Sequence, residues 1–412
     1  MLIVKRRCAW YNKCMKESSK KFNLRYSLIQ GSYWALSGII FGFTAVYLQG
    51  KQYTNYDIGI IFALGNIVGF IAQPLVAGHI DRTRQRTLLR CILIAAALSL
   101  ALMISVLFMP TACLPLSAAF VLLIGGNILF QPLCISLYFY LESLGSKINF
   151  SAARAVGSFS YALANVALGI LVERVSAQSV PVSYIIITAA LGALTLSLTL
   201  GAKPRREISE VQAEVCEKPS GIFEFLRENK RFALFLLGTA LLYFTHSLLG
   251  IFMIEFVRNV GGGSSDMGSI LAFMTLTEVP VMLLFPRLKK RFSCSGLLRF
   301  AVIMFTVKEL AIYLAGSVGM LYAAEALQAL SFAIFVPASV RYADTVIEKR
   351  NAAKGQTYIT AVISMASIFA SLIGGVLLDG AGANAALLVG VLVSAVGTLV
   401  MMFAIQNTPH FL

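Results

Sequence analysis

The sequence predicts an all-α integral membrane protein with 12 transmembrane helices in two pseudo-symmetric six-helix bundles. Of its 412 residues, 58% are hydrophobic and 13% are charged, and the mean hydropathy is +0.80. Soluble globular chains carry about 25% charged residues. A helix needs about 20 apolar residues to cross a bilayer core of about 30 Å. Twelve runs meet this requirement, at approximately 26–48, 57–79, 88–110, 114–141, 150–172, 180–202, 232–256, 266–286, 297–316, 318–340, 355–378 and 382–406.

The placement of basic residues predicts the orientation of these helices. The chain has 34 Lys and Arg residues and a formal net charge of +15. The N-terminal segment and the loops after even-numbered spans hold 29 of them; the other loops hold Lys51, Arg174 and Arg258, and two lie within spans. Cytoplasmic loops carry such an excess. We therefore expect a protein of the cytoplasmic (inner) membrane with both termini in the cytoplasm, in contact with the lipid bilayer and not with nucleic acid.

Composition also predicts the domain boundaries. We expect a basic cytoplasmic N-terminal tail at 1–24, a first bundle at 25–202, a cytoplasmic linker at 203–230, a second bundle at 231–406 and a cytoplasmic tail at 407–412. The first fourteen residues fit no predicted element, and we expect translation to start at Met15.

The two bundles carry traces of an internal repeat. A shift of 206 positions aligns GILVE at 169–173 with GVLLD at 375–379 and pairs Pro74 with Pro280. Parallel repeats of six helices place a solute site at their interface, near the bilayer midplane.

The loop AGHIDRTRQR at 77–86 resembles the loop signature of the major facilitator superfamily. Asp81, Arg82 and Arg86 take its acidic and basic positions, while Arg84 stands where that family usually has glycine. The resemblance implies the major facilitator fold, transport by alternating access, and a gating role for Asp81, Arg82 and Arg86.

Other segments are similar to the lactose permease and its oligosaccharide:proton symporter relatives. FSAARAVGSFSYA at 150–162 resembles the segment that carries a sugar-binding arginine, which falls on Arg154. TLTEVP places Glu278, and MFTVKEL places Lys308, on charged positions of that family. His246 in YFTHSLL resembles the branch of phenylpropionate and nucleoside permeases.

One departure from the permease pattern concerns proton coupling. The span-10 His and Glu of the permease fall on Gln328 and Ser331, and neither of these side chains titrates. The resemblance therefore implies a proton site elsewhere, or a different coupling.

We expect the polar residues within the spans to form the solute site, because a charge at the bilayer centre costs about 2.5–3.5 kcal/mol. The predicted substrate-binding residues are Arg154, His246, Glu278, Lys308 and Gln328. The guanidinium of Arg154 is a planar set of donors suited to hydroxyls or a carboxylate. The alternative for Arg154 is a side chain that reaches the headgroups, and for His246 a hydrogen-bonded core residue.

Glu278 and Glu325 are the predicted proton-coupling residues. Glu278 has no charged residue within one helical turn, so its partner must come from another helix; the alternative is a structural hydrogen bond near Pro280. Glu325 shares a helix face with Gln328, and its alternative is a hydrated position at the end of its helix. A buried Lys308 requires a carboxylate partner, with Glu278 or Glu325 favoured.

The sequence thus predicts a secondary active transporter that imports a small polar solute with protons, with an oligosaccharide or glycoside favoured. A nucleoside or aromatic-acid permease, a drug or metabolite exporter of the same fold and a non-transporting membrane sensor remain alternatives. We do not expect an enzyme, because the three histidines are scattered far apart. Since no Gly-Lys phosphate loop is present, we do not expect transport to be driven directly by ATP. We expect no cofactor, no metal and a monomer. The spans are rich in aromatic residues, Trp34 and Tyr161 among them. We expect most of these rings to face lipid or its interface, and the alternative is a ring that stacks on a sugar or aryl face.

Overall fold

The computed structural model describes residues 2–82, 86–143, 148–201, 222–347 and 352–407. The regular structure in these ranges is helical. The helices are α1 (Leu2–Gly50), α2 (Asn55–Arg82), α3 (Arg86–Leu107), α4 (Leu114–Ser143), α5 (Phe150–Arg174), α6 (Ser179–Gly201), α7 (Ile222–Glu228), α8 (Lys230–Asn259), α9 (Ser264–Arg291), α10 (Cys294–Tyr313), α11 (Val318–Ala326), the 3₁₀ helix η1 (Leu327–Ala329), α12 (Phe332–Val346) and α13 (Ala352–Ala404).

Ten helices of the described residues are long and apolar enough to cross a membrane. One of them, Gly355–Ala404, is 50 residues long and contains the last two predicted spans. Gly382 interrupts it with φ 82° and ψ 176°, a conformation open to glycine. The 20-residue helix α10 matches the predicted span 297–316 but carries three charged residues and is not among the ten. The multi-pass helical membrane class is confirmed.

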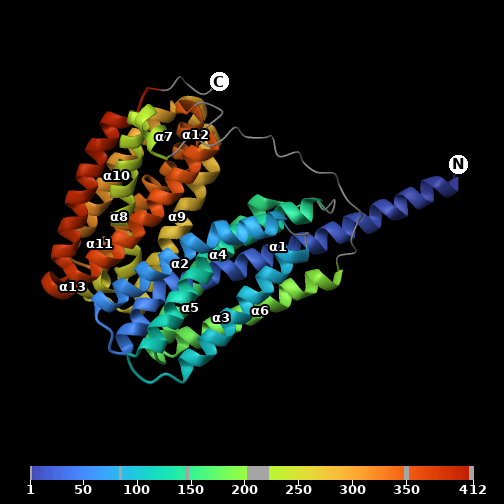
Figure 1. Cartoon of the computed structure of the whole chain (residues 1–412), viewed down its shortest axis with the longest axis horizontal. Coiled ribbons are helices and arrows are strands. Elements are labelled where there is room, and N and C mark those ends of the chain that lie inside the picture. Colours follow the sequence, from blue (N-terminus) through green and yellow to red (C-terminus); the bar gives the residue numbers. More distant parts are fainter. Residues whose placement is uncertain (1, 83–85, 144–147, 202–221, 348–351, 408–412) are drawn as a thin grey trace.

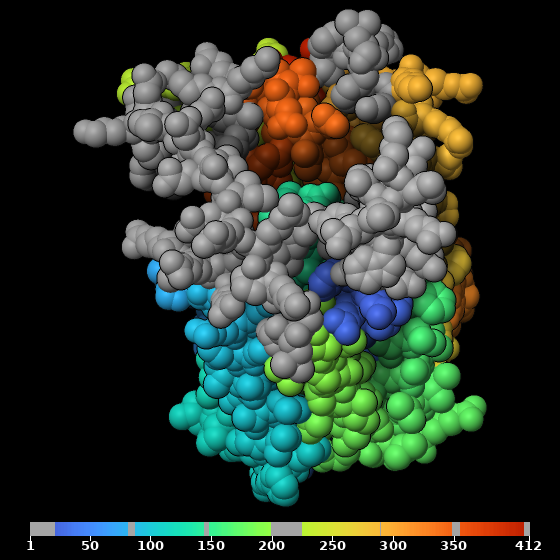
Figure 2. All heavy atoms as spheres, turned by 90° about the vertical axis from the view of Figure 1, so that its right-hand side faces the viewer, coloured from blue at the N-terminus to red at the C-terminus, as the bar shows by residue number. Residues whose placement is uncertain are grey.

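The helices form two groups. Helices α1 to α6 pack against one another and are called the first group; α8 to α13 do the same and are called the second group. In Figure 1 the two groups meet at the lower left and diverge toward the side that carries the N-terminus. Figure 2 looks onto that side, with the second group above and the first group below. The groups touch mainly where α5 packs on α9 and α13 packs on α2.

Apolar side chains face both inward and outward, as expected for a bilayer. In α1, 83% of the apolar membrane-spanning stretch is buried inside the protein, so α1 is a central helix. In α9 the buried share of that stretch is 28%. Large apolar residues such as Leu75, Leu283 and Phe403 are exposed. Exposed apolar surface of this extent is suited to lipid contact rather than to water.

The predicted ends and linker are described only in part. Helix α1 begins at Leu2, so that helical backbone extends through most of the predicted tail. Within the predicted linker, Ile222–Glu228 forms α7, while 203–221 lies outside the described ranges, as does 408–412.

The membrane span that contains α11 and α12 is interrupted in its middle. Helix α11 ends at Ala326, three residues form η1, and α12 begins at Phe332. Short 3₁₀ segments inside a longer helix often mark functional hinges. Broken helices are tolerated at membrane depth where they are buried in protein or line a cavity. This break contains Gln328.

Candidate functional site

Two adjoining cavities lie between the helix groups. Their volumes are about 430 and 220 Å³, and both are lined by Tyr161, His246 and Met274. The larger cavity is within the range of small-molecule sites, about 300–1,000 Å³. Its lining includes Arg154 of the first group and Glu278 of the second. The cavities therefore bring residues from both halves of the sequence together.

Arg154 lies in the second turn of α5 and points into the larger cavity. Its Cζ atom lies 3.8 Å from the centroid of the Trp34 ring, and its Nη1 donates a hydrogen bond to Ser158 Oγ at 2.9 Å. A Cβ atom at Gly157 would lie 2.5 Å from Trp34 Cδ1, so the absence of a side chain there makes room for the indole. The guanidinium is thus held on an aromatic face inside the protein, and the alternative of a headgroup-directed side chain is not what the structure has.

A chain of polar contacts connects the larger cavity with a buried ion pair. Lys308 Nζ lies 2.7 Å from Glu325 Oε2 and donates to Gln328 Oε1 at 2.6 Å. Gln328 Nε2 donates to Glu278 Oε1 at 3.1 Å. Because an ammonium group can only donate, the amide oxygen of Gln328 faces Lys308 and its N–H group faces Glu278. The orientation of Gln328 is therefore fixed by its charged neighbours.

The ion pair in this chain is shielded from solvent. The side chains of Lys308 and Glu325 are 2% and 1% exposed. The alternative of a hydrated Glu325 is therefore wrong, and Lys308 has one of the two carboxylate partners considered for it. Glu309, next in sequence, is also buried, and its Oε2 lies 3.7 Å from where a Cβ of Gly390 would be. It therefore faces α13, away from the contacts of Lys308.

His246 lines both cavities. Its ring stacks on Phe332, with centroids 4.8 Å apart and an interplanar angle of 20°, and lies edge-on to Tyr243 at 5.9 Å. All five predicted substrate-binding residues line the cavities: Arg154, Glu278 and Gln328 the larger, Lys308 the smaller and His246 both.

The predicted gating residues fall outside what the structure describes in detail. Asp81 and Arg82 end α2 and Arg86 begins α3, but their side chains lie outside the described part of the chain. Their gating role stays a prediction.

Two of the aromatic residues follow the alternative of a ring that faces the cavity. Trp34 and Tyr161 both line it. A signal for Tyr161 was present, because Arg154, Ser158 and Tyr161 follow the i, i+4, i+7 spacing of one helix face. Trp34 belongs to α1, and its packing on Arg154 could not be inferred from spacing within one helix.

The chemistry of the cavity is that of polar recognition in an apolar setting. Its lining contains a guanidinium, a carboxylate and an amide, together with aromatic rings. In the described ranges, no group of three or more His, Cys, Asp and Glu side chains could hold a metal ion.

Comparisons with known proteins agree with this architecture. Residues 24–389 match the family model described as "MFS_1 like family". The maltose permease of Geobacillus stearothermophilus is 26% identical over 89% of this chain and 90% of its own length. An uncharacterized transporter of Bacillus subtilis, YwbF, is 24% identical over 93% and 94%.

Solved structures share the fold at low identity. The nucleoside transporter NupG, as its D323A mutant, matches with a TM-score of 0.79 and 15% identity over 93% of this chain and 100% of that chain. A bacterial homologue of the human lysosomal transporter Spinster has a TM-score of 0.64 and 15% identity over 94% of both chains. These relatives are transporters and not enzymes. The chain therefore belongs to the MFS_1 like family and is a transporter of the major facilitator superfamily.

Proposed function

We propose that this protein imports an oligosaccharide or glycoside of the maltose type together with protons, by alternating access. The observation that carries the proposal is the cavity between the helix groups, where Arg154 of the first group and Glu278 of the second line the same space. A solute bound to both would link the two groups, which is what alternating access about a central site requires. The similarity to a maltose permease supports a sugar as the solute.

We also propose the finer topology. Counting α13 as two spans on either side of Gly382, and α11 to α12 as one interrupted span, gives 12 membrane helices in two bundles, 25–202 and 231–406. The excess of Lys and Arg in the N-terminal segment and even-numbered loops supports a cytoplasmic location for both termini. On this topology the groups diverge toward the cytoplasm, and the structure corresponds to an inward-facing state.

The charges around the cavity favour an uncharged solute. Arg154 and Glu278 carry opposite charges, and Lys308 is already paired with Glu325. An anionic solute such as an aromatic acid would meet the carboxylate of Glu278 in the same cavity as the guanidinium of Arg154, and this like-charge contact would disfavour its binding. The faces of two aromatic rings are also in use, since Arg154 covers Trp34 and His246 covers Phe332. The hydroxyl groups of a sugar need no counter-ion and no free aromatic face, because they can bind to the polar groups of the cavity by hydrogen bonds alone.

Glu278 is the proposed proton carrier. It borders the larger cavity, which a proton from water can enter, and no ammonium or guanidinium group forms an ion pair with it in the described part of the chain. Glu325 is instead the counter-ion of Lys308. Gln328 links Glu278 to the pair of Lys308 and Glu325: it accepts from the ammonium of Lys308 and donates to Glu278, and so stabilises the ionised form of Glu278 after proton release.

Uptake of radiolabelled maltose into proteoliposomes with an imposed inward proton gradient tests this function. Wild-type protein should accumulate maltose and should not accumulate uridine. Arg154→Ala should abolish uptake, whereas Arg174→Ala, at the end of the same helix, should transport normally. Full maltose transport by Arg154→Ala at normal membrane levels would remove Arg154 from the site, and uridine uptake in place of maltose would overturn the sugar assignment.

A further inference from the structure

Two carboxylates cap helices that belong to the opposite group. Asp379 of α13 accepts hydrogen bonds from the backbone N–H groups of Asn55 and Tyr56 at 3.1 and 2.7 Å, and Asn55 is the first residue of α2. Glu173 of α5 accepts one from the N–H group of Ser265, in the first turn of α9, at 2.7 Å. We call these contacts the two cross-group caps. Each joins the first group to the second.

The cross-group caps are related by the internal repeat. Glu173 and Asp379 are the last residues of the aligned segments GILVE and GVLLD. The first group supplies one acid to a helix of the second, and the second supplies the equivalent acid to a helix of the first. Two independent surface contacts would have no reason to be equivalent in this way.

Both capped helices also have an acid of their own. In the first group, Thr54 donates through its N–H group and its hydroxyl to Asp57 at 3.1 and 2.8 Å. In the second, the N–H group of Gly263 donates to Asp266 at 2.9 Å. A helix N-terminus carries roughly half a positive charge and unpaired N–H groups, which a carboxylate satisfies. Each N-terminus therefore has one cap that survives separation of the groups and one that separation must break.

The backbones beside the cross-group caps are in direct contact. A Cβ atom at Gly169 would lie 2.6 Å from the carbonyl oxygen of Ser264. A Cβ atom at Gly375 would collide with the carbonyl oxygen of Asn55. Neither position leaves room for a side chain, so the two groups are closed against each other here.

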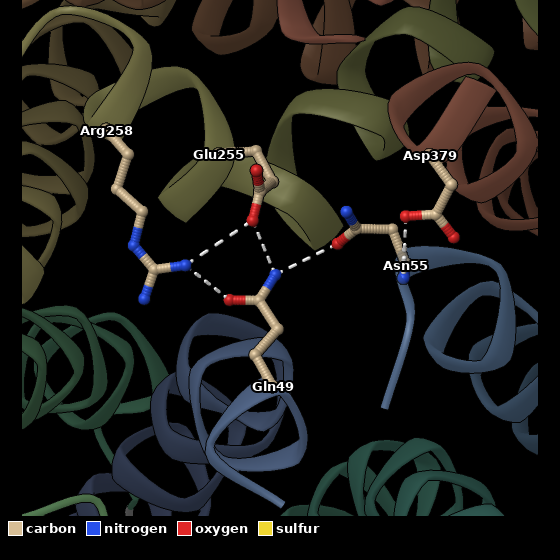
Figure 3. Close-up of polar contacts among 5 residues, drawn as sticks. All are labelled: Gln49, Asn55, Glu255, Arg258 and Asp379. Carbon is tan, nitrogen blue, oxygen red and sulfur yellow. Dashed lines mark hydrogen bonds and ion pairs between the residues drawn. The ribbon is translucent and has the colours of Figure 1, made fainter. Parts of the chain in front are cut away.

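A third link lies next to the Asp379 cap (Figure 3). Gln49 at the end of α1 donates to Glu255 at 2.6 Å and to the Asn55 side chain at 2.9 Å, and accepts from Arg258 at 2.6 Å. Arg258 and Glu255 form an ion pair at 3.4 Å on α8. Gln49 thus connects the first group to a charged pair of the second.

The cross-group caps lie at the end of the molecule away from the open side of the cavity. The larger cavity is lined by Phe150 and Ser151, the first residues of α5, whereas Glu173 lies near its last residue. From Arg154 to Glu173 the helix axis rises roughly 28 Å at about 1.5 Å per residue. The caps therefore close the side opposite to the one on which the groups diverge.

We infer that the Glu173 and Asp379 caps act together as the closure that holds the protein in the state described here. Both caps must break when the cavity opens to the opposite side, because each connects the two groups. The inference rests on the proposed alternating-access transport. If the two groups separate as rigid bodies, both caps break in the same movement. Weakening either cap therefore makes this movement easier and loosens the other cap as well.

Hydrogen–deuterium exchange of the purified full chain, read by mass spectrometry without solute or proton gradient, tests this inference. Asp379→Asn should speed exchange roughly five- to thirty-fold at the start of α2 and also at the start of α9, which it does not touch. Glu173→Gln should speed exchange at the start of α9 and also at the start of α2, which it does not touch. The matched controls Asp57→Asn and Asp266→Asn remove a carboxylate from the same helix ends but within one group, and should change exchange only locally.

The decisive comparison is between exchange at the cap that carries the substitution and exchange at the other cross-group cap. Faster exchange at both caps in each cross-group variant supports the joint closure. Faster exchange only at the altered cap, or unchanged exchange at both, overturns it. A misfolded variant is recognised by faster exchange throughout α3 and α6, which lie in neither cap, and the reciprocal variant then decides the question. Because no solute is used, a failure of maltose transport would leave this result unaffected.

Discussion

Gln328 is held at the centre of the polar chain by two neighbours of opposite charge. Its amide accepts from Lys308 and donates to Glu278, and it is fully buried. The sequence indicated that Lys308 needs a carboxylate and that Glu278 needs a partner from another helix. It could not select the pairing, because that depends on how α9, α10 and η1 face one another.

Replacing Gln328 with methionine should uncouple Glu278 from Lys308. Methionine has a similar length but neither donates to the carboxylate nor accepts from the ammonium as an amide does. We expect proton-driven maltose uptake to fall at least about tenfold, since the loss of a charged hydrogen bond is worth about 1.5–3 kcal/mol. Ser331→Ala is the control, because that hydroxyl donates only within its own turn to the Leu327 carbonyl. Normal uptake by Gln328→Met would refute the linking role.

The buried pair of Lys308 and Glu325 should reveal itself in stability. Lys308→Met or Glu325→Leu alone leaves an uncompensated charge, which costs about 3–5 kcal/mol, whereas the double variant removes both charges. We expect each single variant to lower the thermal unfolding temperature and the double variant to regain most of the loss. A double variant whose loss equals the sum of the two single losses would show that the side chains do not interact.

At the scale of helices, the limits of the spans could be predicted but their partners could not. Apart from α1, which begins at Leu2, and α13, which runs through two predicted spans, the predicted spans agree with the helices within a few residues, because apolar length is a local property of the chain. The repeat was predicted with Pro74 opposite Pro280. In the structure, Asn55 lies against Gly375 of α13 and Ser264 lies against Gly169 of α5, so that Asn55 and Ser264 are equivalent. The shift between Asn55 and Ser264 differs by three positions from the shift that pairs the two prolines. Apolar positions match too readily to fix such a register.

The break in α13 at Gly382 should be sensitive to substitution. Its backbone conformation is open essentially to glycine, so that Gly382→Ala should cost about 1–3 kcal/mol of stability. Gly380→Ala, two residues earlier and also without atoms near an added Cβ, should have no such cost. Thermal unfolding of the two variants measures the difference. Equal unfolding temperatures would indicate that α13 does not need this break.

At the scale of the whole molecule, the proposed transport depends on contacts between the two helix groups. The sequence indicated two repeats and a cavity between them, but it did not indicate that Trp34 would hold Arg154 or that Glu173 and Asp379 would reach across. Such contacts join segments that are far apart in the chain, and no spacing within one helix encodes them. On the proposed mechanism, they determine which end of the cavity is closed.

The most direct test of the central claim, that a solute and a proton move together through this cavity, is proton movement driven by solute. Maltose is added to lightly buffered proteoliposomes, and the external pH is recorded. Wild-type protein should make the medium more alkaline as protons enter with the sugar. Glu278→Gln should give no pH change while it still exchanges labelled for unlabelled maltose, because exchange needs no net proton transfer. Maltose entry into wild-type vesicles without a pH change, or an unaltered pH change with Glu278→Gln, would contradict the account.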